Sequence, residues 1–134
     1  DFHSDEARAK MTAGLALTDA DRWPWLDRIG AALTEVLSAG QTKVIACSAL
    51  KRVYRDRLRA AAGPALRFVY LEAEPEMMRS RVGRRPGHYM PASLVDSQFA
   101  ALEPPRDEAD VVTIGADADL ATTIPGLAAR VQAP

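Results

Sequence analysis

The chain has 134 residues, of which 48% are hydrophobic and 26% are charged, and its formal net charge is -1 at pH 7. This length and composition predict one globular domain over residues 1–134. The balanced charge excludes a general attraction to nucleic acid or to an anionic membrane, and no apolar run approaches the roughly 20 residues of a membrane helix. The single cysteine, Cys47, cannot form an intramolecular disulfide and favours a cytoplasmic protein.

The first half of the chain predicts two helices, a strand and a third helix. Ser4 is a helix cap followed by acids, and Gly14 ends that helix. A second start signal at Thr18 opens a long helix that ends near residue 38. Residues 44–47 form an apolar run without polar alternation, which predicts a strand buried on both faces, and a helix from residue 49 to about 62 follows it directly.

The second half continues the alternation of strands and helices. We expect strands at 67–72 and 110–114, because both runs are apolar and rich in branched or aromatic residues. Helices are expected at 74–85, at 92–102 and at 119–131, the last of which contains Pro125. The pattern predicts an α/β fold with a parallel sheet. Three strands make a thin sheet, so we expect further strands to belong to it.

The strand at 44–47 and the helix after it place polar residues at the carboxyl edge of the sheet, where open α/β proteins bind ligands. Ser48, Lys51 and Arg55 are expected there. Lys51 and Arg55 are one helical turn apart, so the two cations can converge on one anion.

Two further groups of polar residues stand out. The first third of the chain concentrates polar side chains beside Trp23 and Trp25, which predicts a pocket for a polyhydroxylated or anionic small molecule. These side chains are Asp1, His3, Lys10, Asp19, Asp21 and Arg22. Helix caps and surface charges are the alternative explanation for about half of them.

The second group is a cluster of arginines that ends in a Pro-Gly break. Its members are Arg79, Arg81, Arg84 and Arg85, followed by Pro86, Gly87 and His88. Guanidinium groups match phosphate oxygens, and a break of this kind suits a segment that closes over a phosphoryl group. The alternative is a solvated helix end with favourable cations.

Taken together, these segments resemble the gluconokinase family over nearly the whole chain. The segments are Asp19-x-Asp21-Arg22-x-Pro24-Trp25-Leu26, Cys47-Ser-Ala-Leu-Lys51-x-x-Tyr54-Arg55, Arg81-x-x-x-x-x-Gly87-His88 and Ser97-Gln98-Phe99. The resemblance implies a three-layer P-loop kinase fold and the reaction of ATP with D-gluconate to give ADP and 6-phospho-D-gluconate. It also implies Mg²⁺ as cofactor and a homodimer. The cytoplasmic location follows from the single cysteine, and the absence of a nucleic-acid or membrane partner from the charge balance and the lack of a long apolar run.

The family carries N-terminal strands and a Gly-rich phosphate-binding loop ahead of the position that is Asp1 here. We find no such segment in this sequence, so we expect these 134 residues alone to be inactive. The resemblance implies roles for the residues that are present. Substrate binding falls to His3, Lys10, Arg22, Lys51, Arg55 and His88. Arg81 and Asp1 are the catalytic candidates, and Arg81, Arg84 and Arg85 are assigned to the nucleotide phosphates within a lid at residues 79–91.

Two other functions stay open at this point. A kinase of another small acid, such as a shikimate-like compound or a different sugar acid, would share the fold and the lid. A binding protein without a phosphate loop would keep the cations but catalyse nothing. A nucleic-acid-binding protein is disfavoured by the charge balance.

Overall fold

The computed structural model describes residues 2–84 and 94–132. Its elements, in chain order, are α1 (Asp5–Thr12), α2 (Asp19–Ser38), α3 (Arg52–Ala62), a 3-10 turn η1 (Gly63–Ala65), β1 (Phe68–Glu72), α4 (Pro75–Gly83), α5 (Leu94–Ala101), β2 (Val111–Gly115) and α6 (Leu120–Gln132). Every helix predicted from the sequence is confirmed within a few residues, as are the two later strands. No helix in the described part of the chain has the length and apolar character needed to cross a membrane.

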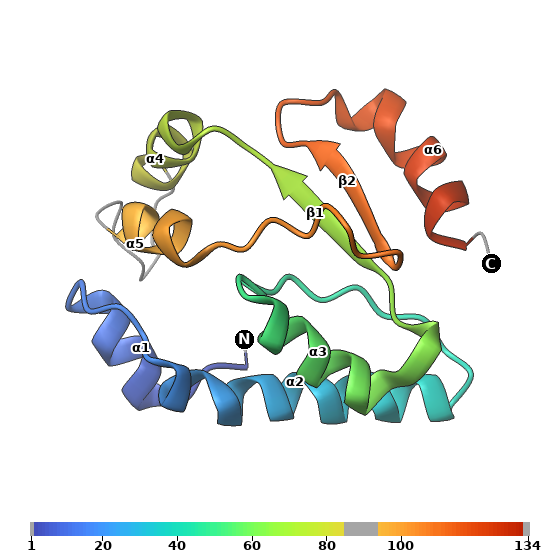
Figure 1. Cartoon of the computed structure of the whole chain (residues 1–134), viewed down its shortest axis with the longest axis horizontal. Helices are drawn as coiled ribbons and strands as arrows, with labels where there is room; N and C mark the ends of the chain where they lie inside the picture. Colours follow the sequence, from blue (N-terminus) through green and yellow to red (C-terminus); the bar gives the residue numbers. More distant parts are fainter. Residues whose placement is uncertain (1, 85–93, 133–134) are drawn as a thin grey trace.

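The sheet of the described residues is a parallel pair. Phe68 lies opposite Val111, and Glu72 lies opposite Gly115. The connection from β1 to β2 passes through α4 and α5, as a parallel crossover requires. Figure 1 shows α2 and α3 on one side of the strands and α6 on the other, with the extended segment after α2 running between α3 and β1. The α/β class and the parallel sheet are therefore confirmed.

The strand predicted at residues 44–47 is wrong. The segment is extended but pairs with no described strand, and the Val44 side chain is 94% exposed. An apolar run becomes a strand only where a neighbouring strand accepts and donates its ladder hydrogen bonds. Here Ile45 and Cys47 pack against the helical core, while Val44 has no cover from the described residues.

The main core lies between α2 and α3. Trp25, Leu26 and Ile29 of α2 interlock with Tyr54 and Leu58 of α3, and each of these side chains is at most 3% exposed. The two helices approach closely because α2 carries a glycine at the contact. A Cβ at Gly30 would lie 2.8 Å from the Cβ of Ala61. This packing fixes the amino ends of α2 and α3 relative to each other.

A smaller core joins α1 to the later part of the chain. Ala7, Met11 and Leu17 pack with Leu94, the first residue of α5. The chain runs from α1 into the amino end of α2. This contact therefore packs α5 close to the polar residues in the first third of the chain.

Candidate functional site

The amino end of α2 holds Lys10 in place. Thr18 and Asp21 form a capping box, in which the Thr18 amide and hydroxyl donate to Asp21 Oδ2 at 2.9 and 2.8 Å. Lys10 Nζ donates to the other carboxylate oxygen of Asp21 at 2.6 Å. The Lys10 hydrogen bond is the largest cause that lowers the pKa of Asp21 to about 2. Asp21 thus caps α2 and also holds the side chain of Lys10, a residue of α1, at the amino end of α2.

Tyr54 is the centre of a group of cations. Its ring is buried at 1% exposure. The guanidinium carbon of Arg22 lies 5.7 Å from the ring centroid, and Lys51 Nζ lies 5.6 Å from it. Cations at such distances are attracted by the negative face of the ring. One aromatic side chain of α3 therefore holds a cation from α2 and a cation from its own amino end.

Asp19 joins the same group from the first residue of α2. Its Oδ1 accepts hydrogen bonds from the Tyr54 hydroxyl and from Lys51 Nζ, the latter at 2.9 Å. The Tyr54 hydrogen bond, followed by that of Lys51, lowers the pKa of Asp19. Because Asp19 is already ionised and occupied, it orients the neighbouring donors rather than acting as a base near pH 7.

Arg22 differs from Lys10 and Lys51 in forming no ion pair with a described acid. The residue is 5% exposed. Its amide donates to the carbonyl of Thr18, but its side chain forms no hydrogen bond or ion pair with another described residue. No buried side-chain nitrogen among the described residues lacks a hydrogen-bond partner, so the unpaired nitrogens of Arg22 keep some access from outside. A largely buried cation is stabilised by a counter-charge or by hydrogen bonds. The arrangement at Arg22 therefore favours an anionic ligand.

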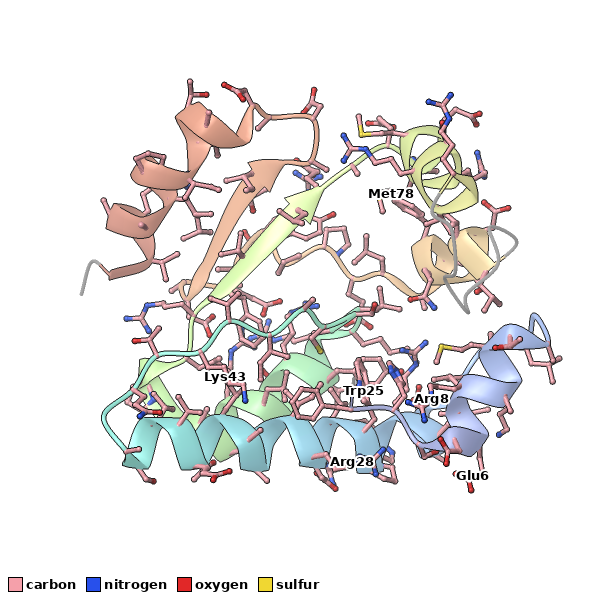
Figure 2. All side chains as sticks on the ribbon, turned by 180° about the vertical axis from the view of Figure 1, so that it is seen from behind. Glu6, Arg8, Trp25, Arg28, Lys43 and Met78 are labelled. Atoms are coloured by element: carbon pink, nitrogen blue, oxygen red, sulfur yellow. The ribbon has the colours of Figure 1, made fainter. Side chains whose placement is uncertain are left out.

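His3 contributes a neutral polar group beside Arg22. Its ring stacks on Trp25 with centroids 4.5 Å apart and an angle of 14° between the planes. Burial is the first cause and Arg22 the second that lower the pKa of His3 to about 4. Figure 2 shows Trp25 on the face of α2 turned toward the strands. At neutral pH His3 is thus an uncharged imidazole, suited to hydroxyl groups rather than to an anion.

Arg55 lies in the same helix but has a different environment. Its Nε and Nη2 donate to the Glu108 carboxylate, its Nη1 donates to the carbonyls of Ala49 and Leu50, and its Nη2 also donates to the carbonyl of Glu103. The side chains of Arg55 and Glu108 are only 4% and 6% exposed. All five guanidinium donors are engaged inside the protein, so Arg55 has none left for a substrate in this structure.

The arginine cluster of α4 does not gather on one anion. Arg81 Nη1 donates to the carbonyl of Ala116, just after the carboxyl end of β2, at 2.8 Å. Arg84 follows α4, exposed and without an ion pair to a described residue. Arg79 instead ties α4 to α5 through Asp96, with Nε and Oδ1 2.9 Å apart. Of the predicted site, Asp1, Arg85 and His88 lie outside the described residues, as does the lid beyond residue 84.

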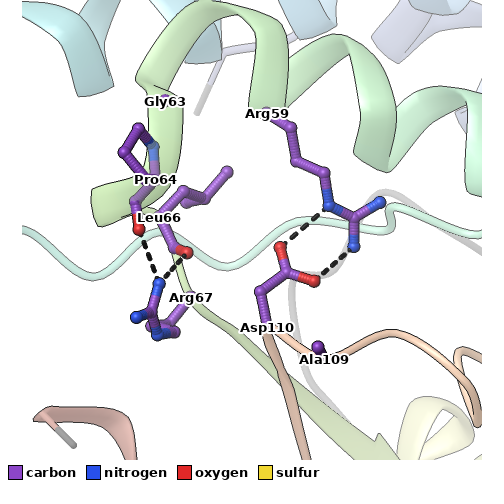
Figure 3. Close-up of a pocket in the computed structure, with 7 residues that line it drawn as sticks. All are labelled: Arg59, Gly63, Pro64, Leu66, Arg67, Ala109 and Asp110. Carbon is purple, nitrogen blue, oxygen red and sulfur yellow. Dashed lines mark hydrogen bonds and ion pairs between the residues drawn. The ribbon is translucent and has the colours of Figure 1, made fainter. Parts of the chain in front are cut away.

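A hollow on the described surface lies elsewhere. It has a volume of about 430 Å³ and is lined by residues that precede β1 and β2 (Figure 3). Arg59 is paired there with Asp110, and Arg67 Nη1 donates to the carbonyls of Pro64 and Leu66. The hollow is at the amino edge of the sheet, whereas ligands of open α/β proteins bind at the carboxyl edge. Its arginines also already have acceptors.

The structure brings together His3, Arg22 and Lys51 around Trp25 and Tyr54, with Lys10 at the same helix end. Tyr54 is a member of the site that was not predicted from the sequence. The signal for it was its position one turn after Lys51, but an aromatic residue in an apolar stripe is equally typical of a core.

Comparisons with known proteins identify relatives of one kind. The chain is 42% identical to the thermosensitive gluconokinase of Escherichia coli (strain K12) over 122 residues, which are 90% of this chain and 65% of that protein. It is 44% identical to the gluconokinase of Gluconobacter oxydans over 108 residues, covering 81% of this chain and 60% of the relative. It is 38% identical to a probable gluconokinase of Mus musculus over 90% of this chain and 74% of the relative. The chain thus spans less than two thirds of the first two proteins, and no protein-family model matches it.

Solved structures agree in fold. A sugar kinase from Janibacter sp. HTCC2649, in an unliganded structure, superposes with a TM-score of 0.86 at 38% identity, over 96% of this chain and 73% of that one. A gluconokinase from Sinorhizobium meliloti 1021 gives a TM-score of 0.81 at 40% identity, over 98% of this chain and 75% of the other.

Proposed function

This chain belongs to the gluconokinase family, and on that premise we propose that it serves the ATP-dependent phosphorylation of D-gluconate to 6-phospho-D-gluconate. The observation that carries the proposal is the largely buried Arg22, whose side chain forms no ion pair with a described residue. Gluconate combines a carboxylate with a row of hydroxyl groups. Its site therefore needs a cation at one end and hydrogen-bonding groups along the rest.

The described residues match this division. Arg22 and Lys51 lie against the same tyrosine ring, and we assign the substrate carboxylate to them. Neutral His3 and the surface ammonium of Lys10 are assigned to hydroxyl groups, since both can donate hydrogen bonds. Arg55 is not part of this assignment, because its donors bind Glu108 and three carbonyls.

The phosphoryl side of the site is proposed to involve Arg81. Its contact with the Ala116 carbonyl places it just beyond the carboxyl end of β2, and its exposed side chain is free to exchange that contact for a phosphate oxygen. A guanidinium in this role stabilises charge on the transferring group. Arg84 and, outside the described residues, Arg85 and His88 remain proposed lid contacts, and Asp1 remains a proposed catalytic residue.

Mg²⁺ would supply charge compensation for the ATP phosphates when bound. Such ions are held mainly by phosphates, water and one or two protein oxygens. The described residues contain no group of three His, Cys, Asp or Glu side chains that could hold a metal ion. We also propose a cytoplasmic homodimer, which size-exclusion chromatography with light scattering would test for the assembly.

The proposal is tested with the full-length protein encoded by the gene. A coupled ADP assay should show kcat/KM for gluconate far above that for shikimate, for other sugar acids and for neutral glucose. Arg22→Ala should raise the KM for gluconate roughly 30-fold, because a charge-assisted contact of about 2 kcal/mol is lost, and should leave the KM for ATP nearly unchanged. Arg130→Ala, in an exposed position of α6, is the matched control.

The possible outcomes separate the alternative functions. A much higher kcat/KM for another acid would assign the protein to that substrate. ATP binding without turnover of any acid would favour the non-catalytic alternative. Equal effects of Arg22→Ala on both KM values would remove Arg22 from the substrate site.

A further inference from the structure

Helix α3 begins without a cap of its own. Its N-cap residue is Lys51, whose side chain makes no capping hydrogen bond, and the first turn contains no acid. The capping position is filled by a distant residue. Glu103 Oε2 accepts a hydrogen bond from the Arg52 amide at 2.6 Å. A carboxylate at this point satisfies a free amide of the helix and interacts favourably with the positive end of its dipole.

The backbone of Glu103 contacts the same segment. Its amide donates to the carbonyl of Leu50 at 2.9 Å, and its carbonyl accepts from Arg55 Nη2 at 3.0 Å. Arg55 Nη1 in turn donates to the carbonyls of Ala49 and Leu50. The residues on both sides of Lys51 are thus held by hydrogen bonds that involve Glu103 or its partner Arg55.

The chain after Glu103 is stiff. Pro104 and Pro105 follow it, and Pro105 is buried. Proline fixes its own φ angle and restricts the residue before it to an extended conformation. The backbone of Glu103 therefore presents its amide and carbonyl to α3 with restricted conformational freedom.

We propose that Glu103 is a positioning residue for Lys51, and through Lys51 for the substrate carboxylate. Lys51 connects the cap to the site, because it is the N-cap residue of α3. Its Nζ also lies 2.9 Å from Asp19 Oδ1 and over the Tyr54 ring. Loss of the cap loosens the backbone at Lys51, and the ammonium group then leaves its place between Asp19 and Tyr54. The part of this inference that concerns substrate rests on the proposed function.

The kinetic test compares Glu103→Ala with Glu35→Ala in the full-length protein. Glu35 is an exposed residue of α2 that is assigned no role in the site. We expect Glu103→Ala to raise the KM for gluconate roughly fivefold, the effect of losing a typical cap, and to leave the KM for ATP within twofold. Glu103→Gln, which keeps an oxygen acceptor, should recover most of the affinity. A lowered Tm with both KM values unchanged would mean that Glu103 only stabilises the fold, and the proposal would be overturned.

A second readout does not depend on activity. Mass spectrometry after brief treatment with an amine-acylating reagent measures how fast Lys51 and the exposed Lys43 react. The hydrogen bond to Asp19 raises the pKa of Lys51, so the wild-type Lys51 should react slowly. Glu103→Ala should accelerate labelling of Lys51 several-fold relative to Lys43.

This readout separates the two proposals. If the wild-type protein does not phosphorylate gluconate, the proposed function fails, and the labelling ratio still decides whether Glu103 positions Lys51. An unchanged ratio overturns the positioning role in either case.

Discussion

The strongest prediction about stability concerns Glu108, which neutralises the buried guanidinium of Arg55. Both side chains are at most 6% exposed. The Arg55 hydrogen bond is the largest cause that lowers the pKa of Glu108 from 4.5 to about 2, against the opposing effect of burial. Each pKa unit corresponds to about 1.4 kcal/mol, so the ionised carboxylate contributes roughly 3 kcal/mol to the free energy of unfolding. Glu108→Gln should remove about that amount, because it leaves Arg55 buried without a counter-charge.

Urea unfolding of the full-length protein at pH 7, followed by tryptophan fluorescence, measures this loss. The control is Asp27→Asn, which breaks the ion pair between Asp27 and Arg57 at the surface. That pair is equally short, with Nε and Oδ1 2.6 Å apart, but its side chains are 54% and 45% exposed. Water and salt screen such pairs strongly, so its loss should be much smaller. A Glu108→Gln effect no larger than that of Asp27→Asn would refute the argument from burial.

The same reasoning gives a pH dependence. The pKa of Glu108 is lower in the folded protein than in the unfolded chain, so its contribution is fully present above about pH 4.5 and is lost as the pH falls toward 2. The difference in unfolding free energy between the wild type and Glu108→Gln should shrink over that interval. A difference that stays constant down to pH 2.5 would contradict the assigned charge.

The other predictions concern the site. Arg81→Ala should lower kcat by roughly two orders of magnitude through lost stabilisation of the transferring phosphoryl group, and steady-state kinetics with an unchanged kcat would exclude that role. Tyr54→Phe keeps the ring under both cations but removes the hydrogen bond to Asp19; we expect a few-fold higher KM for gluconate, whereas an unchanged KM would show that Asp19 needs no such partner. His3 is already neutral above about pH 4, so the KM for gluconate should show no inflection near pH 6.5. Because the pKa of His3 is lowered in the folded protein, the free energy of unfolding should decrease as the pH falls from 6.5 through 4. If a His3→Gln variant shows the same decrease, another group is responsible for it.

Local sequence signals predicted most of the fold because they act over one or two turns. Thr18 opens α2 through a capping box with Asp21, three residues away. The branched and aromatic runs of β1 and β2 find each other as a parallel pair. The run at residues 44–47 is also apolar and contains branched residues, but it forms no strand in the described chain. Composition reports whether a segment suits a sheet, whereas pairing depends on a neighbour that the segment itself does not specify.

The cations of the site show the same limit more sharply. Spacing alone predicted that both Lys51 and Arg55 bind an anion, since the two residues lie on one helix face. The structure separates them because Glu108, 53 residues further along the chain, takes up Arg55. No local pattern could indicate that partner. The burial of Arg22, and the fact that it forms no ion pair with a described residue, are likewise visible only after folding.

The charge balance of the chain explains why a buried cation without an ion pair indicates the site. The chain has 17 lysines and arginines against 18 aspartates and glutamates, so folding can supply most cations with an acid. Helix α3 illustrates this, since all of its arginines are paired with acids, namely Arg52, Arg55, Arg57 and Arg59 with Asp56, Glu108, Asp27 and Asp110 respectively. A largely buried cation that forms no ion pair with a described residue loses solvation free energy and gains only weaker contacts, such as that of Arg22 with the Tyr54 ring. Arg22 is in that position, and a ligand carboxylate is the partner that would offset the cost.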